Sequence, residues 1–186
     1  MNFDRIVCFD LEMCCWNDGR TSRTGEIIEI GVAELDLNTG RIVRRAQHYV
    51  RPEHDEISPF CTELTGIKPD LIEKNGKPLA TILRSIEQKF GGRHKIYAAW
   101  GHDDRILMKE CVAKELKAPF REYLNLATLF KLQRHVTNKR LGQRAAMEIA
   151  GVSWEGRQHS GYVDAYNLAR LAATMFCEKE QLINDK

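Results

Sequence analysis

Carboxylates and one histidine gather in three separated segments of this chain. The first segment carries Asp10 and Glu12, the second carries Asp104, and the third carries His159 and Asp164. Carboxylate oxygens are the ligands that Mg²⁺ and Mn²⁺ prefer, and a neutral histidine can accept a proton near neutral pH. If folding brings the three segments together, the set could hold divalent ions and hydrolyse a phosphodiester bond.

Asp10 and Glu12 follow the apolar run Ile6–Phe9, which predicts a buried central strand. Side chains alternate across a strand, so the two carboxylates share one face and Leu11 points to the other. Two buried carboxylates repel each other unless a cation neutralises them. The alternative is that the strand ends by Asp10 and that both acids lie in solvent.

The other two segments lie at expected helix starts. A predicted strand passes through Gly101 into a helix that begins near Asp104, where an acid can serve a site or simply cap the helix. A loop with His159 opens the last helix, and Asp164 lies in its first turn. Taken alone, that pair would be a structural hydrogen bond or a cap. Because all three segments lie at strand ends or helix starts, they are consistent with one site.

The elements that must position these residues follow from hydrophobic periodicity and capping residues. Strands are predicted at residues 6–9, 26–35, 41–50 and 95–99, and a turn at 36–40 makes the second and third an antiparallel hairpin. Helices are predicted at residues 58–64, 78–90, 104–116, 125–136, 140–150 and 163–177. Strands come first and helices then alternate with them, which favours an α/β fold with a mixed sheet.

The composition describes a single globular domain. The chain has 186 residues, 43% of them hydrophobic, and we expect one domain over residues 1–180 with a polar tail at 181–186. The net charge of +2 is too small to indicate nucleic-acid binding by itself. Basic runs at residues 41–51 and 131–144 could bind a phosphate backbone locally, although a solvated face is the favoured interpretation of each run taken alone.

The cysteines and the N-terminus indicate the compartment. The six cysteines make no C-x-x-C pair and no disulfide framework, which is typical of a reducing environment. The N-terminus leads directly into a strand, so no signal peptide is expected, and no apolar run approaches the ~18 residues of a membrane span. We therefore expect a cytoplasmic protein with no membrane partner.

Several segments carry a resemblance that goes beyond the acids. The chain resembles the DEDDh family of 3′→5′ exonucleases, in the branch of the histone-mRNA and small-RNA exonucleases, at Phe9–Trp16 (FDLEMCCW), Glu26–Gly31 (EIIEIG), Tyr49–Pro52 (YVRP), Ile57–Cys61 (ISPFC), Glu63–Ile67 (ELTGI) and Tyr123–Leu126 (YLNL). The resemblance covers residues 5 to about 177. It implies an RNase H-like exonuclease fold, with a central mixed five-stranded sheet flanked by helices.

The resemblance also implies roles for the candidate residues. Four metal ligands are implied for two ions of Mg²⁺ or Mn²⁺, namely Asp10, Glu12, Asp104 and Asp164. His159 matches the general base of two-metal hydrolysis. The family usually has an apolar or aromatic residue before its middle aspartate, whereas this chain has Asp103. Asp104 is preferred because it stands three residues after Gly101, as in the family, and Asp103 remains the alternative.

The function implied is release of 5′-mononucleotides from single-stranded or frayed 3′ ends, with RNA favoured over DNA. The residues expected to cradle the terminal nucleotide are Met13, Leu64, Thr65, Ile67, Trp100 and His159. Core packing explains Leu64 and Ile67 equally well, and Trp100 could instead pack under the site. The alternatives are a DNA exonuclease of repair or proofreading type and a catalytically silent nucleic-acid-binding module. A homodimer is compatible with the resemblance.

Overall fold

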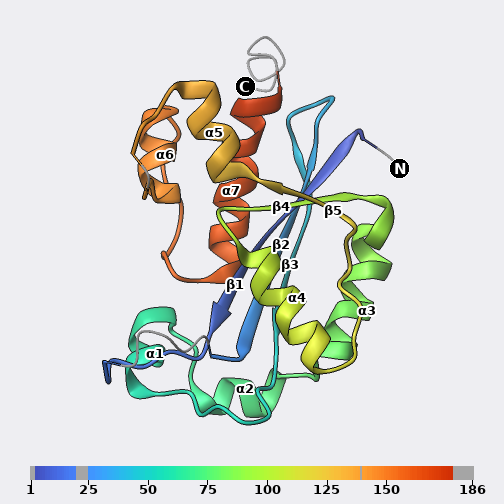
Figure 1. The fold of residues 1–186 in the computed structure, drawn as a ribbon, viewed down its shortest axis with the longest axis vertical. Helices are drawn as coiled ribbons and strands as arrows, with labels where there is room; N and C mark the ends of the chain where they lie inside the picture. The colour runs from blue at the N-terminus through green and yellow to red at the C-terminus, as the bar shows by residue number, and fades with distance from the viewer. Residues whose placement is uncertain (1–2, 20–24, 139, 178–186) are drawn as a thin grey trace.

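A five-stranded sheet with the order β3-β2-β1-β4-β5 forms the centre of the fold (Figure 1). The computed structural model describes residues 3–19, 25–138 and 140–177. The strands are β1 (Arg5–Met13), β2 (Ile27–Asp36), β3 (Ile42–Tyr49), β4 (Ile96–Ala99) and β5 (Glu122–Asn125). β1 pairs antiparallel with β2 and parallel with β4, so the sheet is mixed, as predicted.

β2 and β3 form the expected antiparallel hairpin. The Asp36 carboxylate accepts hydrogen bonds from the backbone of Asn38 and Thr39 in the turn. Gly40 closes the turn with a φ of 70°, a conformation that glycine adopts without steric cost. The turn chemistry read from the sequence therefore sets the register of this edge of the sheet.

β1 sends alternate side chains into two cores. Phe9 and Leu11 pack against α3 (Leu79–Phe90) and the Leu107 side of α4 (Asp103–Ala113), whereas Cys8 packs against α7 (Gly161–Phe176). Because side chains alternate along a strand, Asp10 and Glu12 continue the row of Cys8 that faces α7. The strand runs on to Met13, so the alternative in which it ends by Asp10 is wrong.

Capping residues set the helix ends where the sequence placed them. Ser58 caps α1 (Pro59–Thr65) by accepting a hydrogen bond from the Cys61 N–H, and Gly66 ends the helix with a φ of 80°. The remaining predicted helices correspond to α3, α4, α5 (Leu126–Arg134), α6 (Gln143–Ile149) and α7. Their bounds differ from the predicted ones by a few residues.

Two short elements and a turn were not predicted. α2 (Pro69–Asn75) has seven residues and no side-chain N-cap, and β5 has four residues at the sheet edge. A single 3₁₀ turn, η1 (Gly92–His94), precedes β4. Elements this short give little periodic signal, which explains why they were missed.

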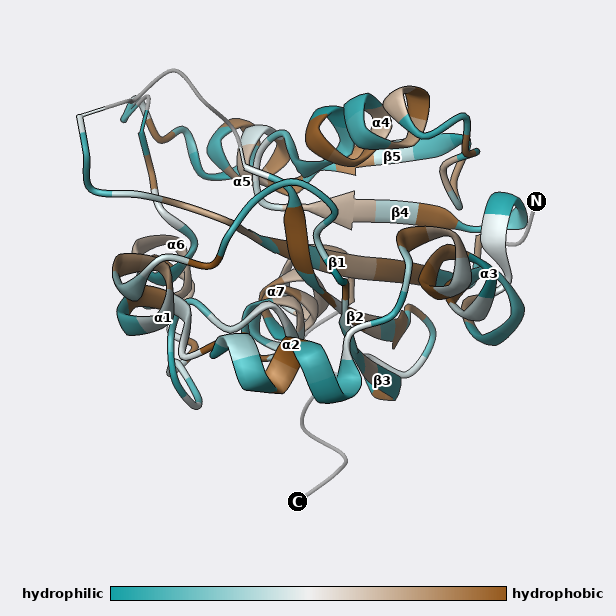
Figure 2. Ribbon diagram, turned by 90° about the horizontal axis from the view of Figure 1, so that it is seen from below, coloured by the Kyte–Doolittle hydropathy of each residue, from teal (hydrophilic) through white to brown (hydrophobic). Residues whose placement is uncertain are grey.

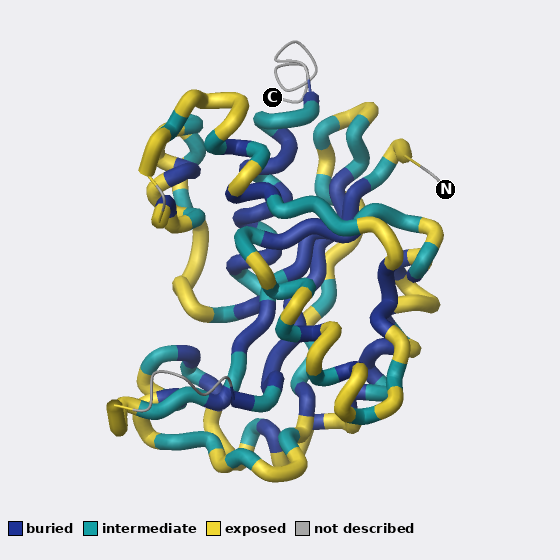
Figure 3. The backbone as a smooth tube through the Cα atoms, in the orientation of Figure 1, coloured by how far each residue is buried: buried dark blue, intermediate teal, exposed yellow. Residues whose placement is uncertain are grey.

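β1, β2 and β4 are mostly buried at the centre of the fold, whereas the helices around them carry both hydrophilic and hydrophobic residues (Figures 2 and 3). All six cysteines lie in the described part of the chain and are free thiols. Among the residues that the structure describes, no helix is both long enough and apolar enough to cross a bilayer. The predicted tail at 181–186 lies outside the described residues.

Candidate active site

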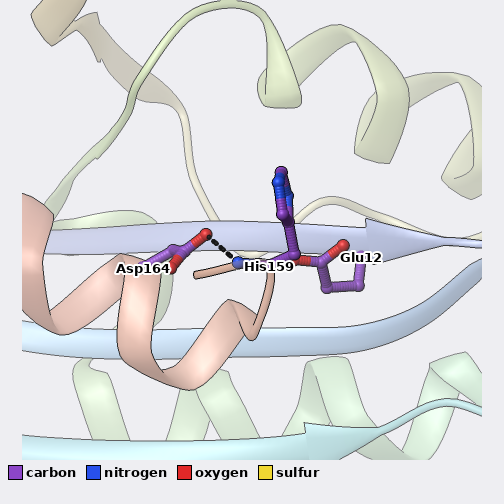
Figure 4. Close-up of side chains that lie close together, drawn as sticks. All are labelled: Glu12, His159 and Asp164. Atoms are coloured by element: carbon purple, nitrogen blue, oxygen red, sulfur yellow. Dashed lines mark hydrogen bonds between the residues drawn. The ribbon is translucent and has the colours of Figure 1, made fainter. Parts of the chain in front are cut away.

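The first and third acidic segments meet where β1 ends and α7 begins (Figure 4). Oxygen or nitrogen atoms of Glu12, His159 and Asp164 all lie within 4.8 Å of one another. Glu12 comes from β1, Asp164 comes from the first turn of α7, and His159 comes from the loop before that helix. The fold therefore brings these three residues together, as the expected site requires.

The carboxylates crowd one another in a poorly solvated site. Burial raises the pKa of Glu12 to about 8, and the charges of Asp164, Glu29 and Asp103 add to this effect. Burial likewise raises the pKa of Asp164 to about 7, even though the His159 N–H lowers it. The pKa of Asp10 lies well above its ordinary value, first through burial and then through the charges of Asp103 and its neighbours. Such a site attracts protons or cations.

The chemistry of this donor set fits a divalent cation. The Oδ1 atom of Asp164 is buried without a hydrogen-bond partner, although buried carboxylate oxygens are normally bonded. The Oδ1 atom of Asp104 is in the same state. An ion that takes oxygen ligands would satisfy such atoms and offset the mutual repulsion of the carboxylates.

Asp103 and Asp104 occupy the first turn of α4 and have different electrostatic neighbours. Asp103 is the strongest charged contributor to the raised pKa of Asp10, and burial, followed by the charge of Asp104, raises its own pKa to about 7. After burial, Asp104 is the first contributor to the raised pKa of Tyr123. Asp103 thus interacts more strongly with the charge of Asp10, whereas the buried Oδ1 of Asp104 lacks a hydrogen-bond partner, so the choice of middle carboxylate between the two stays a prediction.

His159 is held by its backbone and presents an exposed side chain. Its N–H donates to Oδ2 of Asp164 at 3.1 Å, which explains the five-residue spacing between the two. Its φ of 62° lies in the left-handed region, which residues other than glycine adopt infrequently. The ring is thus free to contact substrate while its backbone stays attached to a carboxylate of the site.

Glu29 on β2 is a positioning residue to which the sequence analysis gave no role. Its side chain is 1% exposed, and it accepts hydrogen bonds from the N–H groups of Gly161 at 3.1 Å and Tyr162 at 3.0 Å. The Gln47 amide donates to it at 2.8 Å. These bonds attach the first turn of α7 to β2 and so orient Asp164. A charged residue inside the apolar segment EIIEIG was the available signal.

Gly31 allows α7 to approach the sheet closely. A Cβ atom added at Gly31 would lie 1.9 Å from the Gly161 carbonyl oxygen, a distance that no side chain could accept. Gly161 in turn lies against the backbone of Asp10, because its own added Cβ would be 3.2 Å from the Asp10 oxygen. The backbone of α7 therefore rests directly on the two strands that carry the site.

The expected nucleotide-cradling residues differ in accessibility. Ile67 is 3% exposed and packs in a core cluster, and the Thr65 hydroxyl donates to the Cys61 carbonyl. Leu64 and Met13 are half-buried near the end of β1 and of α1. Ile67 is therefore packed in the core, whereas Leu64 and Met13 keep surface that a nucleotide could contact, and the cradling role of all three stays a prediction.

Trp100 packs against α5 and the segment before α6. Its indole N–H donates to the Leu141 carbonyl oxygen at 3.0 Å, and its ring meets Phe130 edge-on at 5.9 Å between centroids. These contacts give the side chain a packing role of the kind that the sequence analysis set beside base stacking.

Comparison with known proteins identifies the family. The exonuclease family model RNase_T matches residues 7–172. The chain belongs to the RNase_T exonuclease family. Within this exonuclease family, ERI1 exoribonuclease 2 from Xenopus laevis is 32% identical over 95% of this chain and 29% of its own length. The mouse 3'-5' exoribonuclease 1 is 29% identical over 99% of this chain and 56% of its own length. The chain thus spans between about a third and about half of these curated relatives.

Solved structures give the same result. The nuclease domain of 3'hExo, a DEDDh family member bound to rAMP, superposes with a TM-score of 0.82 at 29% identity, covering 92% of this chain and 91% of that one. A 3'-exonuclease described in 3'-end specific recognition of histone mRNA stem-loop superposes with the same TM-score at 27% identity, covering 92% of this chain and 81% of that one. The predicted DEDDh resemblance and the RNase H-like exonuclease fold are confirmed.

Proposed function

We propose that this exonuclease domain is a divalent-metal-dependent 3′→5′ exoribonuclease that removes 5′-mononucleotides from single-stranded or frayed 3′ ends. One observation carries the proposal: Glu12, His159 and Asp164 lie within 4.8 Å of one another although 147 residues separate the first two. Asp10 and Asp103 extend the same acidic cluster. Such a set suits hydrolysis of an anionic phosphodiester.

The four acids would hold two ions of Mg²⁺ or Mn²⁺. Asp10, Glu12 and Asp164 supply three of these acids, and the first turn of α4 supplies the middle one. The ions, when bound, supply positive charge at the phosphate and make a nucleophile available at neutral pH. The surrounding residues hold the acids in place and exclude bulk water. Only 8% of the Glu12 surface is exposed to solvent.

His159 is the proposed general base. A neutral imidazole beside the carboxylates can take the proton of the attacking water, and the exposed ring can reach a substrate in the site. Its backbone bond to Asp164 keeps it within reach of the same phosphate. Leu64 and Met13 would contact the terminal nucleotide, whose 3′ hydroxyl end must enter first.

The preference for RNA rests on the relatives. Two of them are named exoribonucleases, and the solved nuclease domain holds rAMP, a ribonucleotide. Discrimination from DNA would need a contact to the 2′-hydroxyl of the terminal nucleotide. Free thiols at all six cysteines support a reducing compartment such as the cytoplasm.

The test compares 5′-labelled single-stranded RNA and DNA of one sequence, with Mg²⁺, with Mn²⁺ and with EDTA. We expect stepwise shortening of the RNA from its 3′ end and release of 5′-mononucleotides with either metal, and no shortening with EDTA. The Asp10→Asn variant should fold normally and release none. Faster digestion of DNA would favour the DNA exonuclease, and RNA that is bound but never shortened would favour the silent binding module.

A further inference from the structure

The loop that carries His159 is attached to a second part of the site through Arg157. The Arg157 guanidinium donates from Nη2 to the carbonyl oxygens of Glu63 at 2.7 Å and Leu64 at 3.3 Å. Its Nη1 atom lies over Gly66, where an added Cβ would be only 2.3 Å away. Arg157 therefore contacts the end of α1 across 93 residues of sequence.

The end of α1 is a favourable place for this guanidinium. The last carbonyl groups of a helix have no partners within the helix and carry a partial negative charge. The last turn of α1 contains no basic residue, so its own sequence does not supply a cation. A planar guanidinium with several N–H donors can bond two neighbouring carbonyls at once, which an ammonium group does less well.

A separate set of contacts holds the earlier part of the same loop on α7. Asn167 exchanges hydrogen bonds with the backbone of Glu155 at 3.1 and 2.8 Å, and Arg170 pairs with the Glu155 carboxylate at 3.0 Å. Beyond Glu155 the chain leaves α7, contacts α1 through Arg157, and returns to α7 through the His159 N–H. The segment that presents His159 thus spans from one helix to the other.

We propose that Arg157 is a positioning residue that sets where His159 stands relative to the nucleotide held at the end of α1. This inference rests on the proposed exonuclease function. Arg157 bonds the backbone of Leu64, a residue expected to contact the terminal nucleotide, and it stands two residues before the proposed base. Within the described part of the chain, Arg157 makes no hydrogen bond or ion pair with the acidic cluster, so we expect it to act through His159 and not through the metal ligands.

The experiment measures RNA shortening by the parent, Arg157→Ala and Arg157→Lys, each alone and combined with His159→Ala, at several RNA concentrations and pH values. We expect Arg157→Ala to lower kcat about 10-fold with less than about a twofold change in KM, and Arg157→Lys to recover only part of the loss. In the His159→Ala background the same change should have little further effect, because the two residues act as one unit. Arg84→Ala, an exposed arginine on α3, is the matched control and should behave as the parent.

Three further measurements separate positioning from general damage. Mn²⁺ affinity should be unchanged in Arg157→Ala, and added guanidinium ion should restore part of its activity. Amide hydrogen exchange of residues 156–160 should accelerate in this variant whether or not the parent is active. An inactive parent would refute the proposed exonuclease function but not the contact that Arg157 makes with α1. Parent-like kcat, an equal loss in the His159→Ala background, or unchanged exchange of the loop would overturn the role of Arg157.

Discussion

Glu12→Gln should stabilise the metal-free domain while abolishing its activity. Burial and neighbouring charges raise the pKa of Glu12 from 4.5 to about 8. Between these two values the folded state holds a proton that the unfolded state has lost, so the free energy of unfolding falls as the pH rises. The penalty is absent below about pH 4 and complete above about pH 8, where it amounts to at most about 5 kcal/mol.

The assay is urea unfolding in EDTA at pH values from about 4 to 9. At the acidic end, parent and variant should have the same free energy of unfolding, because Glu12 is then protonated in both states. Near pH 9 the variant should be more stable by several kcal/mol, since glutamine carries no charge to bury. Glu148→Gln, on the exposed face of α6, is the matched control and should change stability by less than about 0.5 kcal/mol at any pH.

Metal ions should reduce this difference in stability. Saturating Mn²⁺ stabilises whichever protein binds it, by about 2.7 kcal/mol at a hundred times the dissociation constant, and the parent should gain more than Glu12→Gln. The reasoning would be refuted if the parent showed equal stability from pH 5 to 9 in EDTA. It would also be refuted if Mn²⁺ stabilised parent and variant equally.

Four other substitutions test the remaining parts of the site. Asp103→Asn should lower kcat at least about 100-fold and Asp104→Asn less, and the opposite order would return the middle ligand to Asp104. His159→Ala should lower the rate by about 10²–10⁴-fold, most strongly near neutral pH, and a pH–rate profile identical to that of the parent would remove it from the role of base. Glu29→Gln leaves one acceptor oxygen where two helix N–H groups and the Gln47 amide now bond. The affinity for Mn²⁺, measured by calorimetry, should therefore fall about 10-fold. Parent-like affinity would show that Glu29 does not position Asp164.

The sequence predicted the parts of the fold that local chemistry determines. Ser58 and Gly66 set the ends of α1 by capping, and period-two alternation put Asp10 and Glu12 on one face of a strand. Convergence of the three acidic segments could be expected only because each lies at a strand end or a helix start.

Long-range contacts account for what the sequence did not predict. Glu29 bonds α7 across 132 residues, and Arg157 bonds α1 across 94 residues, so no local pattern indicates either role. Asp103 and Asp104 are adjacent on α4, so their side chains point in directions about 100° apart around the helix axis. The position of α4 on the sheet determines which of the two faces the site, and the sequence gives no direct measure of that position.

The contact between Gly31 and Gly161 has a consequence for ion selectivity. The backbones of the helix and the strand touch at these glycines, and the Glu29 carboxylate bonds the first turn of α7 to β2, so the two sides of the carboxylate cluster are held at a fixed separation. A frame of fixed width suits a small ion with strict octahedral demands more than calcium, whose ligands lie further out at about 2.3–2.6 Å and adopt variable arrangements. We therefore expect these two residues without side chains to favour such a small ion over calcium at the neighbouring carboxylates.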